Sequence, residues 1–472
     1  MLDDTIAAIA TPLGEGGLAV IRLSGARAFQ IVDQCFRPRG SHSQSAQTAP
    51  SHTLHYGHIV RNSAAPSTLQ LFNSSTDHPT VIDEVLVAVM RGPRTFTRED
   101  VVEITCHGGL LPAKAVLDTV LASGARLALP GEFTKRAFLN GRIDLAQAEA
   151  VADVIHSRTE LALAAANEQL AGKLSQRINK LRDDLLATLA HVEAHIDFPD
   201  EDIAPDTKDK LAARLESGIA LMEELLRTAD EGQLLRRGIR AAIVGPPNAG
   251  KSSLLNQLLG RDRAIVSAIP GTTRDTIEET ANVRGIPVVF VDTAGLREAR
   301  DEIEIEGIKR SHQSLAQAEL VLLVLDASEA FTPADEQFLS TVRGRKCIIV
   351  RNKIDLPARL TLPLAENIQV VDVSCLTGAG IERLKDTIKD LVWSGEVTAG
   401  MFQVMINSRH QEALRRARAA AADALHGLRA DQTFELVAID LRLSLNAVGE
   451  VVGKTTTEDL LDSIFSQFCI GK

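Results

Sequence analysis

The sequence predicts a multidomain protein that combines α/β domains with an all-α domain. Its 472 residues exceed what one ordinary hydrophobic core organises, so roughly two to four domains are expected. An apolar run, a glycine-containing loop and a helical pattern follow one another at residues 241–259, as in a parallel α/β domain. Amphipathic helical patterns lie on both sides of this segment. We therefore expect an α/β domain inserted into one helical domain, which is tolerated where the inserted domain's ends lie close together.

The first part of the chain reads as a separate α/β domain. Strands are predicted for the apolar runs 5–10, 18–23, 81–90 and 101–106, and helices for 26–35 and 112–122. Two polar stretches, 40–52 and 61–80, predict loops. The predicted segments are an N-terminal α/β domain at 1–128, the first part of the helical domain at 129–236, the inserted domain at 237–394 and the second part of the helical domain at 395–472.

The helical domain is predicted from the spacing of apolar residues. Between residues 145 and 237 they recur every three or four positions, as one buried helix face requires. The clearest series is Ile178, Leu181, Leu185, Leu189, Val192 and Ile196. Pro199 interrupts this pattern, which resumes at 206–231. Beyond the inserted domain, further helices are predicted at 411–428, 434–445 and 458–468.

Composition narrows the class of protein. The formal net charge of −11 argues against a broad basic surface that grips nucleic acid unaided. Five cysteines, an odd number without a C-x-x-C spacing, indicate neither a disulfide framework nor a zinc site. No signal segment opens the chain, and no apolar run approaches the ~20 residues of a membrane span. We therefore expect a cytoplasmic protein.

The segment 245–252 has the form G-x-x-x-x-G-K-S and joins a predicted strand to a predicted helix. Backbone N–H groups and the helix N-terminus of such a P-loop point at one concavity and favour bound phosphate. Gly245 and Gly250 allow the tight turn. We expect Lys251 to reach the β- and γ-phosphates and act in catalysis, and the Ser252 hydroxyl to ligate Mg²⁺.

Further motifs each follow a predicted strand, where open α/β sheets bind ligands. Residues 292–295 (D-T-A-G) fit the second magnesium-side carboxylate and the γ-phosphate sensor, and in 271–275 (G-T-T-R-D) Thr273 can complete the Mg²⁺ shell. In 352–355 (N-K-I-D), Asp355 can accept from both guanine N–H groups, which adenine cannot match. Together they predict a P-loop (Ras-like) GTPase domain. The predicted GTP-binding residues are Asn248, Ala249, Gly250, Lys251, Ser252, Ser253, Ser267, Ala268, Ile269, Pro270, Gly271, Thr272, Thr273, Asp292, Thr293, Ala294, Gly295, Asn352, Lys353, Asp355 and Ser374.

The position after D-x-x-G, where Ras-type GTPases carry a water-orienting glutamine, holds Leu296. Another group must therefore neutralise the charge that develops between the β- and γ-phosphates. A K⁺ ion held by the Asn248 carbonyl could do so. Its remaining predicted ligands are Ser267, Thr272 and the backbone of Ile269. The alternative is that Asn248 only caps the loop, and the sequence does not choose between the two.

The chain resembles the TrmE (MnmE) family of tRNA-modification GTPases nearly from end to end. The resemblance rests on residues 245–253, 271–275 and 292–298 in the GTPase segment, and outside it on 130–134, 136–150 and 468–472. Generic GTPases share the first set but not the second. One departure is Arg98, which stands where this resemblance leads us to expect glycine.

The resemblance implies a potassium-activated GTPase whose two GTPase domains meet during hydrolysis, with Glu304 positioning the attacking water through a second water. It implies a dimerising N-terminal domain that binds 5-formyl- or methylene-tetrahydrofolate, with Arg22, Glu103, Arg142 and Lys472 at the matching positions. A guanidinium suits the folate carboxylates, and Glu103 could accept from the pterin amine. The resemblance also implies that Cys469 takes part in the modification chemistry, and it leaves the chemical role of this thiol open.

The resemblance also implies partners. An FAD-containing protein of the MnmG (GidA) type would join the homodimer in a heterotetramer or larger assembly and supply most of the tRNA contacts. Together they would add an aminomethyl or carboxymethylaminomethyl group to carbon 5 of the wobble uridine, position 34, of certain tRNAs. Two alternatives stay open: a switch-type GTPase in ribosome or RNA assembly without one-carbon chemistry, and a dimeric scaffold with slow turnover.

Overall fold

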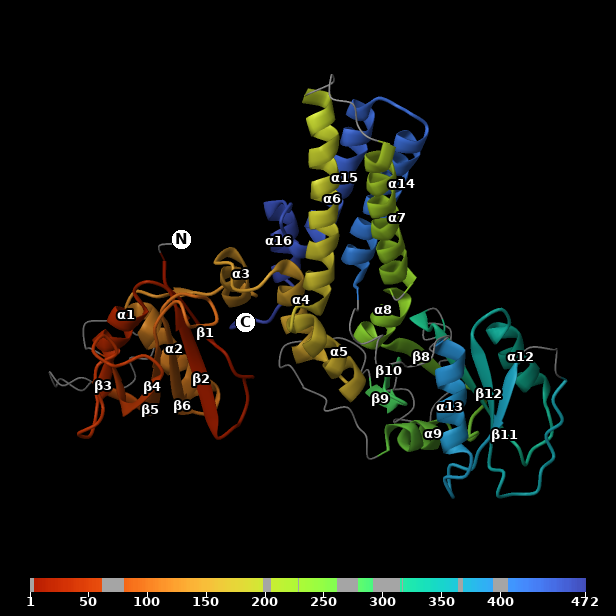
Figure 1. Cartoon of the computed structure of the whole chain (residues 1–472). Coiled ribbons are helices and arrows are strands. Elements are labelled where there is room, and N and C mark those ends of the chain that lie inside the picture. Colours follow the sequence, from red (N-terminus) through yellow and green to blue (C-terminus); the bar gives the residue numbers. More distant parts are fainter. Residues whose placement is uncertain are drawn as a thin grey trace. The chain divides into compact units, whose positions relative to one another are not determined.

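The computed structural model describes residues 4–61, 80–197, 205–227, 229–260, 279–291, 315, 317–363, 368–393 and 406–472. These residues fall into two compact units. The first contains Met1–Ala152 and Val452–Lys472, and the second contains the described residues between 153 and 451. Each unit has its own sheet, and both sheets are drawn in Figure 1.

The first unit is built on a seven-stranded sheet in the order β3-β4-β5-β6-β2-β1-β7. The strands are β1 Ile6–Ile9, β2 Leu18–Ser24, β3 Phe36–Pro38, β4 Thr53–Arg61, β5 Thr80–Met90, β6 Val101–His107 and β7 Arg126–Leu127. Neighbouring strands are antiparallel except β1 and β7. Helices α1 (Ala28–Cys35) and α2 (Leu110–Ala122) pack on this sheet, because their apolar faces need cover. The predicted strands and helices are present, and β3, β4 and β7 are additional strands.

Three more helices belong wholly or mainly to the first unit: α3 Glu132–Leu139, α4 Leu145–His156 and α16 Glu458–Phe465. Leu145 and Ala148 of α4 share one apolar cluster with Phe465 and Phe468 from the end of the chain. The first and last parts of the sequence are therefore joined by hydrophobic packing.

The helices of the second unit come from both sides of its sheet segment. They are α5 Glu160–Leu170, α6 Lys173–Asp197, α7 Pro205–Arg227, α8 Ala229–Arg237, α14 Ser408–Arg429 and α15 Phe434–Val452. Helix α7 packs against α6 and α14, so helices that precede and follow the sheet lie side by side (Figure 1). The predicted insertion of an α/β domain between two parts of a helical domain is confirmed. The segment boundaries stay a prediction.

The inserted sheet has six strands in the order β13-β12-β11-β8-β10-β9. They are β8 Ile239–Val244, β9 Glu279–Val283, β10 Ile286–Phe290, β11 Leu320–Asp326, β12 Cys347–Asn352 and β13 Gln369–Asp372, parallel apart from β9. Helices α9 (Lys251–Leu259) and α13 (Ile381–Val392) cover one face, and α12 (Pro333–Val342) the other. Because both faces of the sheet are covered, the central strand β11 is apolar from Leu320 to Leu325 and buried along its whole length. The phosphate loop (residues 245–250) follows the carboxyl end of β8, the N-K-I-D segment begins at the end of β12, and the base-side loop (residues 374–378) follows β13.

Candidate nucleotide and folate sites

The loop between β8 and α9 passes so close to its neighbours that two positions require glycine. Gly245 has a φ of +147°, and a Cβ there would lie 2.1 Å from the Val324 carbonyl oxygen. Gly250 has a φ of +96°, and a Cβ there would lie 2.1 Å from Nδ2 of Asn352. The loop therefore lies against β11 and β12 without room for side chains, and its backbone faces the carboxyl edge of the sheet.

Lys251 folds back over this loop. Its Nζ donates to the carbonyl oxygens of Gly245 (2.9 Å) and Pro246 (2.7 Å). Burial lowers the pKa of the Lys251 ammonium from its ordinary value. An anion placed in the loop would offset this desolvation, because a nearby opposite charge favours the charged form. The position suits the predicted contact of Lys251 with phosphate.

Asn248 lies exposed in the middle of the loop in the left-handed conformation, with a φ of +60°. Asparagine adopts this conformation more readily than most residues. The backbone alone thus gives one reason for asparagine at this position, and both sequence interpretations of its carbonyl stay open. Ser252 and Ser253 occupy the first turn of α9.

Asn352 joins the phosphate loop to the base-side loop. Its side chain is 2% exposed at the end of β12. Nδ2 donates to the Ala249 carbonyl (2.9 Å), and Oδ1 accepts from the Cys375 amide (3.1 Å). A second connection runs from Nε2 of Gln257 in α9 to the Cys375 carbonyl (2.8 Å). The two loops are therefore held together before any ligand is bound.

Asp355 and Ser374, both predicted on the base side, are in contact. The Ser374 hydroxyl donates to Oδ1 of Asp355 (2.5 Å) and accepts from the Thr377 amide (3.2 Å). Asp355 is exposed while Ser374 is fully buried. This arrangement orients an exposed carboxylate next to the phosphate loop, as recognition of two N–H donors requires.

Lys353, the remaining predicted base-side residue that the structure describes, makes an ion pair that the sequence reasoning missed. Its Nζ lies 2.5 Å from Oδ2 of Asp326, the last residue of β11. Burial alone would raise the pKa of Asp326, but the hydrogen bonds from Lys353 and Ser328 outweigh it and lower the pKa. One sequence signal could have pointed to Asp326: it ends an apolar strand, just as Asp292 directly follows an apolar run.

Several predicted residues lie outside the part of the chain that the structure describes. They are Ser267, Ala268, Ile269, Pro270, Gly271, Thr272, Thr273, Asp292, Thr293, Ala294, Gly295 and Glu304. The predicted Mg²⁺ ligand Thr273, the K⁺ ligands other than Asn248 and the water-positioning Glu304 therefore stay predictions.

In the first unit, Arg22 and Glu103 face each other across β2 and β6. Arg22 Nη2 lies 2.7 Å from Oε1 of Glu103, and Arg22 Nη1 donates to the Gly471 carbonyl (3.4 Å). Lys472, which follows Gly471, is held through its backbone: its carbonyl accepts from the Phe133 amide (3.2 Å). Arg22, Glu103 and the backbone of Lys472 thus lie in one region, whereas the exposed Arg142 makes a backbone bond to Ala137.

The C-terminal tail is fixed by its backbone and by lack of space. The Cys469 carbonyl accepts from the Gly131 amide (3.3 Å), and the Cys469 side chain is exposed. Gly471 has a φ of +95°, and a Cβ there would lie 2.5 Å from the Ile9 carbonyl oxygen. The tail therefore lies against β1, with the thiol accessible.

Arg98 keeps the backbone conformation that glycine would favour. Its φ is +60°, and its Nη1 donates to the Asn140 carbonyl (2.9 Å). The departure from the expected glycine thus leaves the left-handed turn in place, and the arginine side chain adds a contact to the end of α3.

A buried arginine near the tail was also missed by the sequence reasoning. Arg136 of α3 is 1% exposed, and its guanidinium contacts Asp4 (2.6 Å), Glu132 (3.1 Å) and Glu99 (3.2 Å). Arg126 completes the group by binding Asp4 and Glu132, each at 2.6 Å. The buried charge is tolerated because both terminal nitrogens of the guanidinium are paired with carboxylates, although Nε has no hydrogen-bond partner among the residues that the structure describes.

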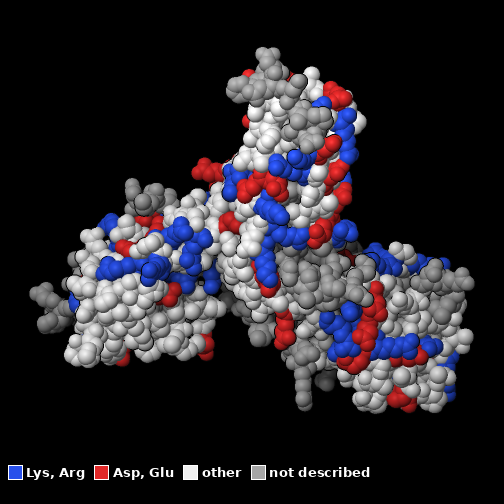
Figure 2. Space-filling view, in the orientation of Figure 1, with Lys and Arg blue, Asp and Glu red and all other residues white. Residues whose placement is uncertain are grey.

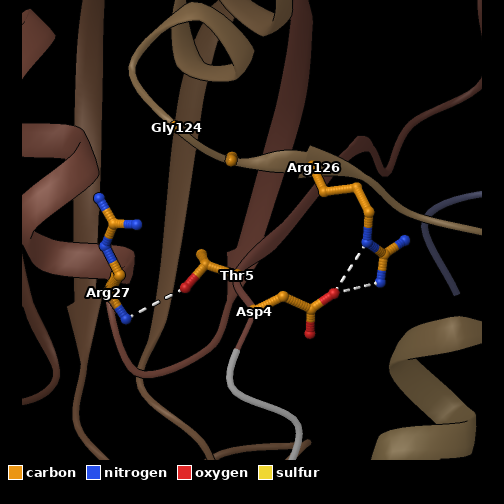
Figure 3. Close-up of a pocket in the computed structure, with 6 residues that line it drawn as sticks. Asp4, Thr5, Arg27, Gly124 and Arg126 are labelled. Carbon is orange, nitrogen blue, oxygen red and sulfur yellow. Dashed lines mark hydrogen bonds and ion pairs between the residues drawn. The ribbon is translucent and has the colours of Figure 1, made fainter.

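A cavity of about 410 Å³ opens beside this group (Figure 3). It is lined by Asp4, Thr5, Arg27, Gly124, Ala125 and Arg126. In Figure 3 the Arg126 guanidinium points to the Asp4 carboxylate, so these two lining charges neutralise each other. Arg22 and Glu103 do not line this cavity. This cavity is therefore separate from Arg22 and Glu103, two of the predicted folate residues.

Comparisons with known proteins decide the family. Residues 5–142 match the family described as the N-terminus of the GTP-binding protein TrmE, and residues 145–469 match the family described as the MnmE helical domain. The chain belongs to the MnmE family. A tRNA modification GTPase MnmE of Geobacillus kaustophilus is 48% identical over 475 residues, covering 99% of each chain. MnmE of Bacillus subtilis is 45% identical over 476 residues, covering 99% of this chain and 100% of that one.

Membership in the MnmE family makes this chain a P-loop GTPase that takes part in tRNA modification. Among solved structures, an Era variant of Aquifex aeolicus bound to GDP and aluminium fluoride is 28% identical and covers 39% of this chain and 66% of that one. Its TM-score is 0.25. No helix in the described part of this MnmE chain is long and apolar enough to cross a membrane.

Proposed function

We propose that this chain is a potassium-activated GTPase that works with an FAD-containing partner of the MnmG type. The pair adds an aminomethyl or carboxymethylaminomethyl group to carbon 5 of the wobble uridine, position 34, of certain tRNAs, and GTP hydrolysis drives the conformational change. The supporting observation is the phosphate loop joined through Asn352 to the base-side loop, in a chain whose relatives are tRNA modification GTPases along its full length.

In the proposed GTPase site, Lys251 binds the β- and γ-phosphates, and Asp355 accepts from the two N–H groups of guanine. Ser252 and Thr273 would ligate Mg²⁺, and hydroxyl oxygens are the hard donors that this ion prefers. Asn248, Ser267, Ile269 and Thr272 would hold K⁺. The exposed amide of Asn248 supplies a neutral oxygen of the kind a monovalent cation needs. The ion would supply positive charge between the β- and γ-phosphates, and Glu304 would position the attacking water.

In the proposed folate site, Arg22, Glu103, Arg142 and Lys472 bind a 5-formyl- or methylene-tetrahydrofolate that donates the one-carbon unit. Support comes from the pairing of Arg22 with Glu103 next to the Gly471 carbonyl. These two contacts orient the Arg22 guanidinium, and a guanidinium is the side chain whose planar fork best matches a carboxylate. Cys469 is proposed to act in the modification chemistry from the adjoining tail.

The proposed assembly is a cytoplasmic homodimer that joins the FAD-containing partner in a heterotetramer or larger complex and contacts tRNA mostly through it. The charge distribution supports this division of labour. On the face shown in Figure 2, acidic and basic side chains alternate along the helices of the second unit. Together with the net charge of −11, this pattern favours a tRNA grip supplied by another protein.

Three measurements test the proposal. Nucleosides from tRNA of cells that lack this protein should lose the C5 modification at position 34, and unchanged nucleosides would refute the modification role. GTP hydrolysis by the purified protein should be faster in K⁺ than in Na⁺ at equal ionic strength; equal rates would remove the potassium step. If tetrahydrofolate derivatives do not bind, the alternative of a switch GTPase in RNA assembly gains support.

A further inference from the structure

We propose that Asp326 is a positioning residue for nucleotide recognition, which holds the Lys353 side chain in place at the base side of the site. This inference rests on the proposed GTP-binding function and adds a residue from a strand that none of the recognised motifs includes. The ligand class is a guanine nucleotide.

The backbone brings the two residues together from neighbouring strands. Asp326 and Asn352 are register partners at the ends of β11 and β12, and the Ala327 amide donates to the Asn352 carbonyl (2.8 Å). Lys353 follows directly with a φ of +64°, a left-handed conformation that turns the chain at the sheet edge. Lys353 thus lies between Asn352, which contacts the phosphate loop, and Asp355, the predicted base acid.

The Asp326 carboxylate is itself fixed. It is 9% exposed, and Oδ1 accepts from the Ser328 amide (2.9 Å) and the Ser328 hydroxyl (2.6 Å). This leaves Oδ2 for the Lys353 ammonium at 2.5 Å. A lysine side chain has several rotatable bonds, so ordering it costs rotamer entropy. Because the ion pair with Asp326 already orders the Lys353 side chain, nucleotide binding does not have to supply this entropy cost.

The test compares dissociation constants for GDP and GTP, measured with fluorescent analogues on the full-length protein. Asp326→Asn keeps the shape but removes the charge, and we expect about three- to tenfold weaker binding of both nucleotides, as for one long side chain immobilised on binding. Ser328→Ala should give a smaller loss because it loosens the carboxylate without removing it. Asp372→Asn is the matched control: it breaks the Arg351–Asp372 pair of similar length (2.5 and 2.7 Å) one strand away and should leave affinity unchanged.

A double-mutant cycle separates positioning of Lys353 from a general structural role. If Asp326 acts through Lys353, adding Asp326→Asn to Lys353→Met should cause no further loss of affinity, and Asp326→Glu should recover part of the loss in the single variant. Additive losses, or unchanged affinity in Asp326→Asn, would overturn the inference. If Asp326→Asn does not fold, unchanged affinity in Ser328→Ala has the same meaning. Failure of the unmodified protein to bind guanine nucleotides would instead refute the proposed function.

Discussion

Replacing Asn352 by alanine should uncouple the phosphate loop from the base-side loop. The change removes two hydrogen bonds of a side chain that is 2% exposed, leaving the Ala249 carbonyl and the Cys375 amide without that partner. A buried polar group that loses its partner costs about 1–3 kcal/mol, so the free energy of unfolding of the inserted domain should fall by about 2–5 kcal/mol. For a domain of about 150–250 residues this lowers the melting temperature by about 5–15 °C.

The assay can follow Trp393, which is the single tryptophan of the sequence and packs in one cluster with Ile286 of β10. Its fluorescence reports unfolding of the inserted sheet, and hydrogen exchange at residues 245–250 reports loosening of the loop. Gln257→Ala is the control, because it removes only the second connection to Cys375 and should cost about 1 kcal/mol. A melting temperature within about 1 °C of the unmodified protein, with unchanged exchange in the loop, would refute this reasoning.

Three further predictions concern single residues. Asp355→Asn should shift nucleotide preference from GTP toward xanthosine triphosphate, measured by competition binding; undiminished preference for GTP would contradict the base-side assignment. Glu304→Ala should abolish hydrolysis while nucleotide binding persists, and normal turnover would exclude Glu304 from the mechanism. For Glu132, burial acts to raise the pKa, but the bonds from Arg126, the Leu129 amide and Arg136 outweigh it and lower the pKa below 4.5. Its contribution to stability is therefore present above pH 4.5 and lost as pH falls through the lowered value. Glu132→Gln should flatten this dependence of stability on acid pH, measured by hydrogen exchange in β1. An unchanged slope of stability against pH would show that Glu132 does not cause the dependence.

The parts of the site that the sequence predicted are those carried by short patterns. A strand, a glycine loop and a lysine fall within residues 239–259, and N-K-I-D follows its strand directly, so local spacing was enough to place them. The pairing of Asp326 with Lys353 was missed because it depends on β11 lying beside β12, which is a property of strand order. The buried Arg136 was missed for a related reason: charged residues are mostly exposed, and only the folded chain shows its three acidic partners.

The predicted folate residues show the limit of resemblance. Arg22 and Glu103 come together because their strands pair in register, which the sequence did not reveal by spacing. The Lys472 carbonyl accepts from the Phe133 amide, a role that any residue could fill and that therefore leaves no mark in the sequence. Strand β4 was missed because it follows a polar stretch that reads as loop.

The attachment of the last residues to the first strand has a consequence for biosynthesis. A ribosome synthesises β1 before the GTPase sheet, but Phe465, Phe468 and Gly471, which pack with α4 or against β1, only after that sheet. The GTPase sheet and most of its surrounding helices are complete by then, so the usual N-terminal-first order of folding cannot hold for the finished first unit. A nascent chain that stops before Leu461 would leave the apolar surface of α4 without this cover.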